Sequence, residues 1–281
     1  MFLYKVTVLF RLVHFVSFKF IFNDRVALSY YNDRANVGDS LNVDLFKYYT
    51  GKSVVNVPGM RLFIHYLGVG SILNSMTKKS VVWGSGLISE SSVDDIRDLG
   101  RIYALRGDKT KRKIESRFNI KLNVPLGDPA LLMPRVYKKE INSKSIYRFG
   151  IVPHYVDIHH PMIEEMISCG GKVIDVSLPV EEFIKQISMC DVILSSSMHG
   201  LILADAYKIP NIRLVFSDNI TGGDFKFDDY YSTTDNPKES ENKVIVDDDF
   251  DIYNCLNKVS IKNYIYNLDD LESAFPSYDL K

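Results

Sequence analysis

The chain has 281 residues, of which 46% are hydrophobic, 12% aromatic and 25% charged. These proportions are typical of a globular protein and exclude a disordered, collagen-like or coiled-coil chain. Because 34 basic and 35 acidic side chains give a formal net charge of -1, the chain offers no large positive field to a nucleic acid backbone, and we expect no nucleic acid partner.

Residues 1–25 form a basic, apolar N-terminal segment. Basic side chains at four positions interrupt its first 22 residues, so the segment is too broken for a transmembrane helix, and no small-residue cleavage site of a signal peptide follows it. We therefore expect a cytoplasmic protein. Two interpretations of the segment stay open: residues 1–22 contact the inner face of the cell membrane peripherally, or they form a first helix packed on the body.

Residues 26–135 are predicted to form a Rossmann-like α/β domain, because short β-branched or aromatic runs alternate with amphipathic segments. The strand Val26–Tyr31 leads through a loop to a helix that Asp39 is predicted to cap and Gly51 to end. Three further strands and one charged, exposed helix follow at Ser53–Val57, Ser80–Trp83, Arg101–Leu105 and Asp108–Phe118.

Residues 136–146 are predicted to be a linker, and residues 147–235 a second Rossmann-like domain. Its strands are expected at Tyr147–Val152, Lys172–Val176, Asp191–Leu194 and Asn211–Phe216, with helices at Asp157–Cys169, Pro179–Met189 and Met198–Lys208. The chain is polar from Thr221 to about Asp251, which indicates solvated loops, and residues 236–281 are assigned to a polar loop and C-terminal segment. Two such domains face a cleft, and ligands of parallel sheets bind at the strand-to-helix loops.

The turn SSSMHG follows the strand Asp191–Leu194 and contains Ser195, Ser196, Ser197, His199 and Gly200. A helix N-terminus carries unpaired N–H donors and a partial positive charge, so a serine-rich turn there is suited to a phosphate or carboxylate. His199 would exchange a proton beside that anion. In the alternative interpretation Ser197 only caps the helix and His199 satisfies a buried partner.

Other turns at strand ends contribute further candidates. WGSG lacks the lysine of a phosphate-binding P-loop and is weak evidence for nucleotide binding. Arg106, in the turn LRGD, is able to bind a carboxylate or phosphate through two hydrogen bonds, or to form a structural salt bridge. The residues that we single out are Asn36, Gly38, Asp39, Trp83, Gly84, Ser85, Gly86, Arg106 and His154.

The three cysteines, Cys169, Cys190 and Cys255, have no metal-ligand spacing. They are interpreted as core thiols of a protein in a reducing compartment. No metal site is predicted.

Seven motifs, in this order, are shared with a known family: NVGDSLN, VVWGSGL, YALRGDKT, LGDPALL, IVPHYVD, ILSSSMHGLILADAYKIP and FKFDDYYST. Together they run from about residue 26 to 233, and the chain resembles the polysaccharide pyruvyl transferase family, in its branch of bacterial capsule and exopolysaccharide enzymes. The resemblance implies a fold similar to that of two-domain, GT-B-like glycosyltransferases. It also implies transfer of a pyruvyl group from phosphoenolpyruvate to sugar hydroxyls, commonly as a cyclic ketal, in surface polysaccharide biosynthesis.

That reaction requires no cofactor and no metal; phosphoenolpyruvate is the donor and a saccharide, free or lipid-linked, is the acceptor. Many family members carry arginine two residues before the histidine, where this chain has Ser197. We infer that hydroxyls and the helix terminus substitute, with Arg106 or another cation completing the charge balance. His199 is the expected acid, and His154 or Asp39 the expected base.

Two other function classes remain open. The same architecture serves glycosyltransferases that use a nucleotide sugar, and fold does not fix function. The departure at Ser197 also allows a catalytically inactive scaffold in a polysaccharide assembly complex. Thermal stabilisation by phosphoenolpyruvate but not by nucleoside diphosphates would favour pyruvyl transfer.

Overall fold

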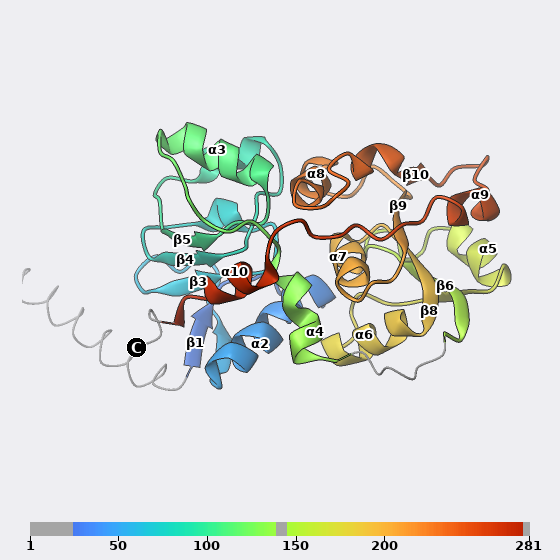
Figure 1. Cartoon of the computed structure of the whole chain (residues 1–281), viewed down its shortest axis with the longest axis horizontal. Coiled ribbons are helices and arrows are strands. Elements are labelled where there is room, and N and C mark those ends of the chain that lie inside the picture. The colour runs from blue at the N-terminus through green and yellow to red at the C-terminus, as the bar shows by residue number, and fades with distance from the viewer. Residues whose placement is uncertain (1–24, 139–144, 278–281) are drawn as a thin grey trace, which may run out of the picture.

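The computed structural model describes residues 25–138 and 145–277 and contains two five-stranded, fully parallel sheets (Figure 1). The predicted α/β class with two Rossmann-like sheets is confirmed. The predicted membrane contact of residues 1–22, and residues 139–144 of the predicted linker, lie outside the described residues. In the part of the chain that the structure describes, no helix has the length and apolar character needed to cross a membrane.

The first sheet has the strand order β2-β1-β3-β4-β5. Its strands are β1 (Arg25–Leu28), β2 (Ser53–Asn56), β3 (His65–Leu67), β4 (Ser80–Trp83) and β5 (Arg101–Ala104). Helices α2 (Val37–Thr50), α3 (Asp108–Phe118) and α4 (Met133–Val136) accompany it. The sequence did not reveal β3, because three residues are too few to show a period-two pattern.

The second sheet has the order β10-β9-β8-β6-β7. Its strands are β6 (Tyr147–Val152), β7 (Gly171–Val173), β8 (Cys190–Ser195), β9 (Asn211–Val215) and β10 (Val244–Ile245), with helices α5 (Met162–Ser168), α6 (Val180–Ser188) and α7 (Met198–Ala206). Short 3-10 helices lie at Leu73–Ser75 (η1), Ser91–Asp95 (η2), Pro129–Leu132 (η3) and Glu239–Asn242 (η4). In each sheet the direction in which successive strands are added reverses beside the strand that comes first in the chain, which is β1 in the first sheet and β6 in the second. Parallel sheets bind ligands at such a switch point.

Helix α2 begins differently from the prediction. The N-cap is Asn36, whose side-chain oxygen accepts the N–H of Gly38, so Asp39 lies inside the first turn and does not cap. An acidic side chain in the first turn is favoured by the helix dipole. The predicted end at Gly51 is correct, because this glycine adopts the left-handed conformation (φ 66°) that closes a helix.

The largest cluster of buried hydrophobic side chains spans both halves. It includes Leu41 and Phe46 of α2 together with Phe183 of α6 and Leu201 of α7. A backbone hydrogen bond from the N–H of Val37 to the carbonyl of Val176 joins the halves directly beside this cluster. The start of α2 is therefore fixed against the second half.

The C-terminal part is more structured than the polar sequence indicated. It forms α8 (Phe225–Tyr231), α9 (Ile252–Leu256) and α10 (Leu268–Ser273), and β10 extends the second sheet. Figure 1 shows this last segment running from the second half back to the first, where α10 lies beside the first sheet. There the indole N–H of Trp83 donates to the carbonyl of Leu271 at 2.9 Å, and Arg135 forms ion pairs with Asp269 and Glu272. The prediction of solvated loops missed α8 because two of its charged residues, Lys226 and Asp229, are buried together with its aromatic residues.

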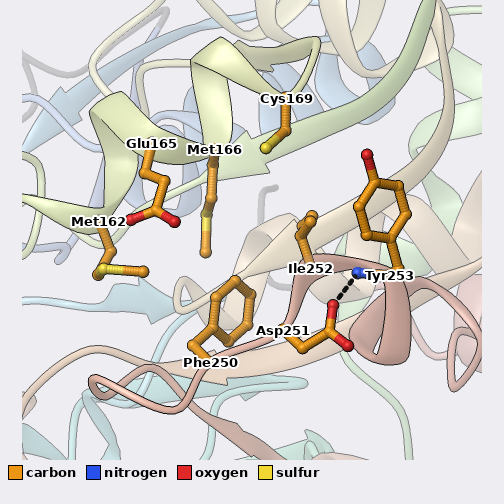
Figure 2. Close-up of a pocket in the computed structure, with 8 residues that line it drawn as sticks. All are labelled: Met162, Glu165, Met166, Cys169, Phe250, Asp251, Ile252 and Tyr253. Carbon is orange, nitrogen blue, oxygen red and sulfur yellow. Dashed lines mark hydrogen bonds between the residues drawn. The ribbon is translucent and has the colours of Figure 1, made fainter.

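The three cysteines are free thiols. Cys190 and Cys255 are buried as predicted, whereas Cys169 is partly exposed. Cys169 borders a small, mostly apolar pocket between α5 and α9, shown in Figure 2. Burial raises the pKa of the Cys190 and Cys255 thiols to about 12, so both remain protonated.

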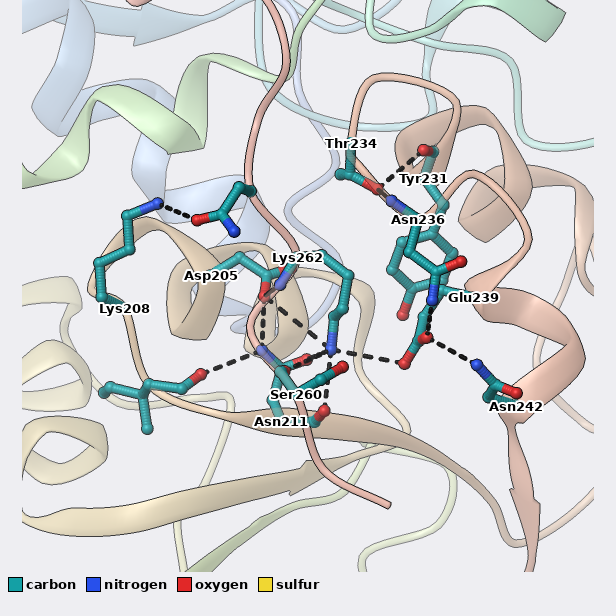
Figure 3. A network of polar contacts seen from close by, with 12 residues as sticks. Asp205, Lys208, Asn211, Tyr231, Thr234, Asn236, Glu239, Asn242, Ser260 and Lys262 are labelled. Atoms are coloured by element: carbon teal, nitrogen blue, oxygen red, sulfur yellow. Dashed lines mark hydrogen bonds and ion pairs between the residues drawn. The ribbon is translucent and has the colours of Figure 1, made fainter.

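A buried polar network fixes the C-terminal segment to the second half (Figure 3). The ammonium of Lys262 is fully buried and donates to the carbonyl oxygens of Asn211 and Ser260. It lies 3.9 Å from a carboxylate oxygen of Asp205 and 3.6 Å from one of Glu239. Burial raises the pKa of Asp205 to about 6 despite the neighbouring ammonium.

Replacing Lys262 by methionine is expected to lower the free energy of unfolding by about 3 to 5 kcal/mol, because two buried carboxyl groups lose their cation. Urea unfolding of both proteins measures the difference. Lys208→Met is the control: this exposed lysine only donates to Asn263, and a change within about 0.5 kcal/mol is expected. Equal midpoints for wild type and Lys262→Met would show that the network does not stabilise the fold.

Candidate active site

A pocket of about 330 Å³ lies where the carboxyl ends of both sheets meet. The lining residues lie beyond the carboxyl ends of six strands, either in loops or in the first turns of the helices that follow. In the first half they come after β1 (Tyr31, Asn36, Asp39), β3 (Gly70, Ser71, Ile72) and β4 (Ile88), and in the second half after β6 (His154, Tyr155, Val156), β8 (Ser197, Met198, His199) and β9 (Asn219, Thr221, Lys226). Strands β1 and β3 flank the switch point of the first sheet, and β6 and β8 that of the second. The pocket thus occupies the position that the topology favours for a ligand.

His199 lies in the first turn of α7, between the two halves. Its Nε2 atom is 3.7 Å from Oδ2 of Asp128. A β-carbon on Gly38 would lie 2.0 Å from Nδ1 of the ring. Glycine is therefore required at position 38 for steric reasons: it allows the imidazole to pack directly on the start of α2.

The three serines of the SSSMHG turn differ in their surroundings. The Ser195 hydroxyl is buried and accepts the N–H of Ser197, and that of Ser196 accepts the N–H of His154 and donates to Asp157. Only Ser197 lines the pocket, and its side chain makes no capping hydrogen bond to α7. Ser195 and Ser196 therefore shape the turn, and Gly200 is needed because a β-carbon there would lie 2.4 Å from the Ser195 hydroxyl.

His154 lines the pocket from the loop after β6, against the ring of Tyr155, with ring centroids 4.1 Å apart. Burial and, to a smaller extent, the charge of Lys226 lower the pKa of His154 to about 4, against the opposing effect of Asp157. The ring is therefore neutral at physiological pH. Its Nδ1 accepts the N–H of Val156 at 3.4 Å, so we assign the ring proton to Nε2.

Asp39 lines the pocket from the first turn of α2. Burial raises its pKa to about 6, although the neighbouring His199 and hydrogen bonds from Tyr31 and Asn36 lower it. A carboxyl group whose pKa lies this close to neutrality is able both to accept and to return a proton.

Arg106 is placed outside the pocket lining. Its guanidinium is fully buried and donates to Asp229 at 2.9 Å, to the hydroxyl of Ser71 at 2.6 Å and to the carbonyl of Leu87 at 2.7 Å. The same carboxylate of Asp229 accepts the N–H of Thr110 at the start of α3. Arg106 thus joins α3, α8 and the loop after β4. Of the two interpretations of this arginine, an anion ligand or a structural salt bridge, the structure shows the salt bridge.

The WGSG turn also lies behind the pocket wall. Trp83 is fully buried, and the Ser85 hydroxyl donates to the carbonyl of Gly70. A β-carbon on Gly86 would lie 2.3 Å from the guanidinium carbon of Arg106, and one on Gly84 2.2 Å from the ring of Pro129. These residues support the pocket loops and do not line the pocket.

Lys226 was missed by the sequence analysis. It lies on α8 and lines the pocket although only 9% of the residue is exposed. Burial, Arg106 and Arg213 together lower its pKa to about 8. Its ammonium makes no ion pair within residues 25–138 and 145–277. The sequence signal is a lysine between two phenylalanines in FKFDDYYST, a pattern that places a cation between aromatic side chains.

Groups of three or more His, Cys, Asp or Glu side chains arranged to hold a metal ion are absent from the described ranges. The pocket instead combines two histidines, one carboxyl group of raised pKa, an isolated ammonium and the N-terminus of α7. Such a combination serves proton transfer beside a bound anion.

Comparison with known proteins agrees with the motifs. Residues 9–218 match the polysaccharide pyruvyl transferase family, and the chain belongs to this family. It is 29% identical over 213 residues to an uncharacterised protein of Acanthamoeba polyphaga mimivirus, covering 74% of each chain. It is 27% identical over 213 residues to the succinoglycan biosynthesis protein ExoV of Rhizobium meliloti, covering 72% of this chain and 62% of ExoV.

Family membership confirms the resemblance inferred from the seven motifs and identifies the chain as a transferase. It also connects the protein with polysaccharide biosynthesis. The roles of the individual pocket residues are a separate question, which the geometry of the pocket addresses.

Proposed function

We propose that the protein transfers a pyruvyl group from phosphoenolpyruvate to two hydroxyls of a saccharide. The observation that carries the proposal is Lys226, a nine-tenths-buried residue that lines the pocket and whose ammonium has no carboxylate partner in the described structure. Burying an unpaired charge is costly unless a ligand compensates it. Together with the N-terminus of α7, Lys226 makes the pocket suited to a small anion such as phosphoenolpyruvate.

The reaction adds a proton to C3 of phosphoenolpyruvate, which makes C2 electrophilic. The oxygen of one sugar hydroxyl bonds to C2 and loses its proton; the C2–O bond to phosphate then breaks, and the second hydroxyl bonds to C2 and loses its proton to the departing phosphate. The products are a cyclic ketal and inorganic phosphate. The reaction therefore needs an acid near C3, a base near the hydroxyls and a cation near the phosphate.

The pocket residues match these three needs. His199, at the start of α7, donates the proton to C3. Asp39 is our choice of base, because its pKa of about 6 is closer to neutrality than that of His154 at about 4. The neutral His154 donates a hydrogen bond from Nε2 to the ligand in the pocket. Lys226 supplies the positive charge that, in many family members, comes from an arginine at the position of Ser197.

Two further expectations belong to this proposal. One is that the halves face each other as in GT-B-like glycosyltransferases, which is supported by a pocket lined from both sheets. The other is a lipid-linked acceptor at the inner face of the membrane, which is supported by the basic, apolar composition of residues 1–22.

Two measurements test the proposal. Phosphoenolpyruvate is expected to raise the thermal unfolding midpoint, whereas nucleoside diphosphates leave it unchanged. Mass spectrometry of candidate glycans after incubation with phosphoenolpyruvate is expected to show the addition of a pyruvyl unit with loss of water. Stabilisation by nucleoside diphosphates alone would favour a nucleotide-sugar glycosyltransferase instead.

The choice of base predicts a pH dependence. Asp39 accepts a proton only when ionised, so kcat/KM is expected to fall about tenfold per pH unit below about 6. In Asp39→Asn the remaining activity should no longer depend on pH in this range. Phosphate release measured across the acid range checks this, and an acid limb near 4 would point to His154 as the base.

A further inference from the structure

Asp128 is a buried carboxylate that the reaction described above does not use. It precedes η3, and its Oδ1 accepts the N–H of Ala130 at 3.0 Å while Pro129 occupies the first helical position. The residue is completely buried. This cap fixes the orientation of the carboxylate within the first half of the protein.

The second oxygen of Asp128 points to the other half. Oδ2 is buried and has no hydrogen-bond partner within the described residues, and the same is true of Nε2 of His199. These two atoms lie 3.7 Å apart. An approach of about 1 Å would form a charge-assisted hydrogen bond, and such bonds commonly shorten when a substrate binds.

The burial of Nε2 determines which ring nitrogen is available for chemistry. His199 borders the pocket, but its Nε2 is enclosed, so the pocket side of the ring carries Nδ1. Nδ1 packs on Gly38, where a β-carbon would lie 2.0 Å from it, and Asp39 lines the pocket from the same turn of α2. A carboxylate that binds one nitrogen of an imidazole determines the tautomer and frees the other nitrogen.

We propose that Asp128 is a positioning residue that holds the Nε2–H of His199 and thereby leaves Nδ1 as the atom that exchanges a proton with the substrate. The step rests on the proposed function: Nδ1–H of the imidazolium gives its proton to C3 of phosphoenolpyruvate, and the ring that remains is neutral and keeps Nε2–H toward Asp128. No proton passes to the carboxylate in this step. The contact between Asp128 and His199 also aligns the acid, which belongs to the second half, with the first half, which carries Asp39.

Nitrogen NMR of protein labelled at histidine tests the tautomer without substrate, with the His199 signals assigned from their loss in His199→Ala. At a pH where the ring is neutral, Nε2 should carry the proton and Nδ1 should not. In Asp128→Asn the amide oxygen still caps η3 and the amide N–H₂ faces Nε2, so the tautomer should reverse. A wild-type ring protonated at Nδ1, or identical ring signals in both proteins, would overturn the proposal.

Activity provides the second test. Asp128→Asn is expected to lower kcat for phosphate release about 100-fold, with the KM for phosphoenolpyruvate changing by less than about threefold. Because Asp128 acts through His199, adding Asp128→Asn to His199→Ala should cause no further loss. A further loss in that background would indicate a purely structural role. Absence of phosphoenolpyruvate turnover in wild type would overturn the proposed function, while the NMR result would still decide the role of Asp128.

Discussion

His199→Ala is expected to lower the rate of phosphate release from phosphoenolpyruvate in the presence of acceptor by about 10²- to 10⁴-fold, the range typical of a lost general acid. Position 199 lies at the start of α7, where alanine is a good helix former, so the fold should persist. Binding of phosphoenolpyruvate should be affected less than turnover, because the ammonium of Lys226 remains. Turnover and thermal stabilisation by the donor, measured on the same sample, separate the two effects.

The matched control for this variant is His159→Ala, which removes an exposed histidine of the same half that does not line the pocket. It should retain wild-type turnover. Full activity in a folded His199→Ala protein would remove this residue from the mechanism and leave the pocket without its proposed acid.

Lys226→Met is expected to weaken binding of phosphoenolpyruvate about 10- to 100-fold, because a hydrogen bond to a charged group contributes about 1.5 to 3 kcal/mol. The same substitution should leave the unliganded protein at least as stable as wild type. Methionine fills a similar volume beside Phe227 and removes an ammonium that burial disfavours. Calorimetric titration with the donor and thermal unfolding without it measure the two effects.

The charge of Lys226 also predicts a pH limb. A lysine is charged below its pKa, so kcat/KM for phosphoenolpyruvate should fall as pH rises through about 8. This limb should be absent from Lys226→Met. Lys109→Met is the control, because Lys109 pairs with Asp228 on the exposed side of α8 and should affect neither binding nor the limb. Donor affinity that is equal in Lys226→Met and wild type would exclude Lys226 as the anion-binding cation.

The fold was largely predictable because the longer elements have clear local signals. The bounds of α3, β4 and β6 were predicted correctly from periodicity and from the glycine and proline residues that punctuate the chain. Strands β3 and β10 were missed, since two or three residues show no period and owe their structure to neighbouring strands. Helix α8 was missed because its polar residues form contacts within the protein instead of facing solvent.

The sequence predicted where in the fold the site lies better than it predicted which residues line it. Sequence patterns identified His199, His154, Asp39 and Ser197, all of which line one pocket. Arg106 and the WGSG turn occupy similar loops but lie behind the pocket wall, where Arg106 donates to Asp229 of α8 and Trp83 donates to Leu271 of α10. Only three-dimensional packing distinguishes a guanidinium held by Asp229 from one that faces a ligand. Lys226 lies on α8, outside the strand-to-helix turns from which the candidates were chosen, and its role follows from its burial.

The return of the C-terminal segment to the first half restricts how the enzyme exchanges ligands. The chain crosses between the halves once after α4 and again before α10, and the apolar cluster around α2, α6 and α7 would be exposed to water if the halves separated. A wide hinge opening is therefore energetically unfavourable. Donor entry and product release should instead depend on local rearrangement of the pocket-lining loops, such as those that carry Ile88 and Asn219.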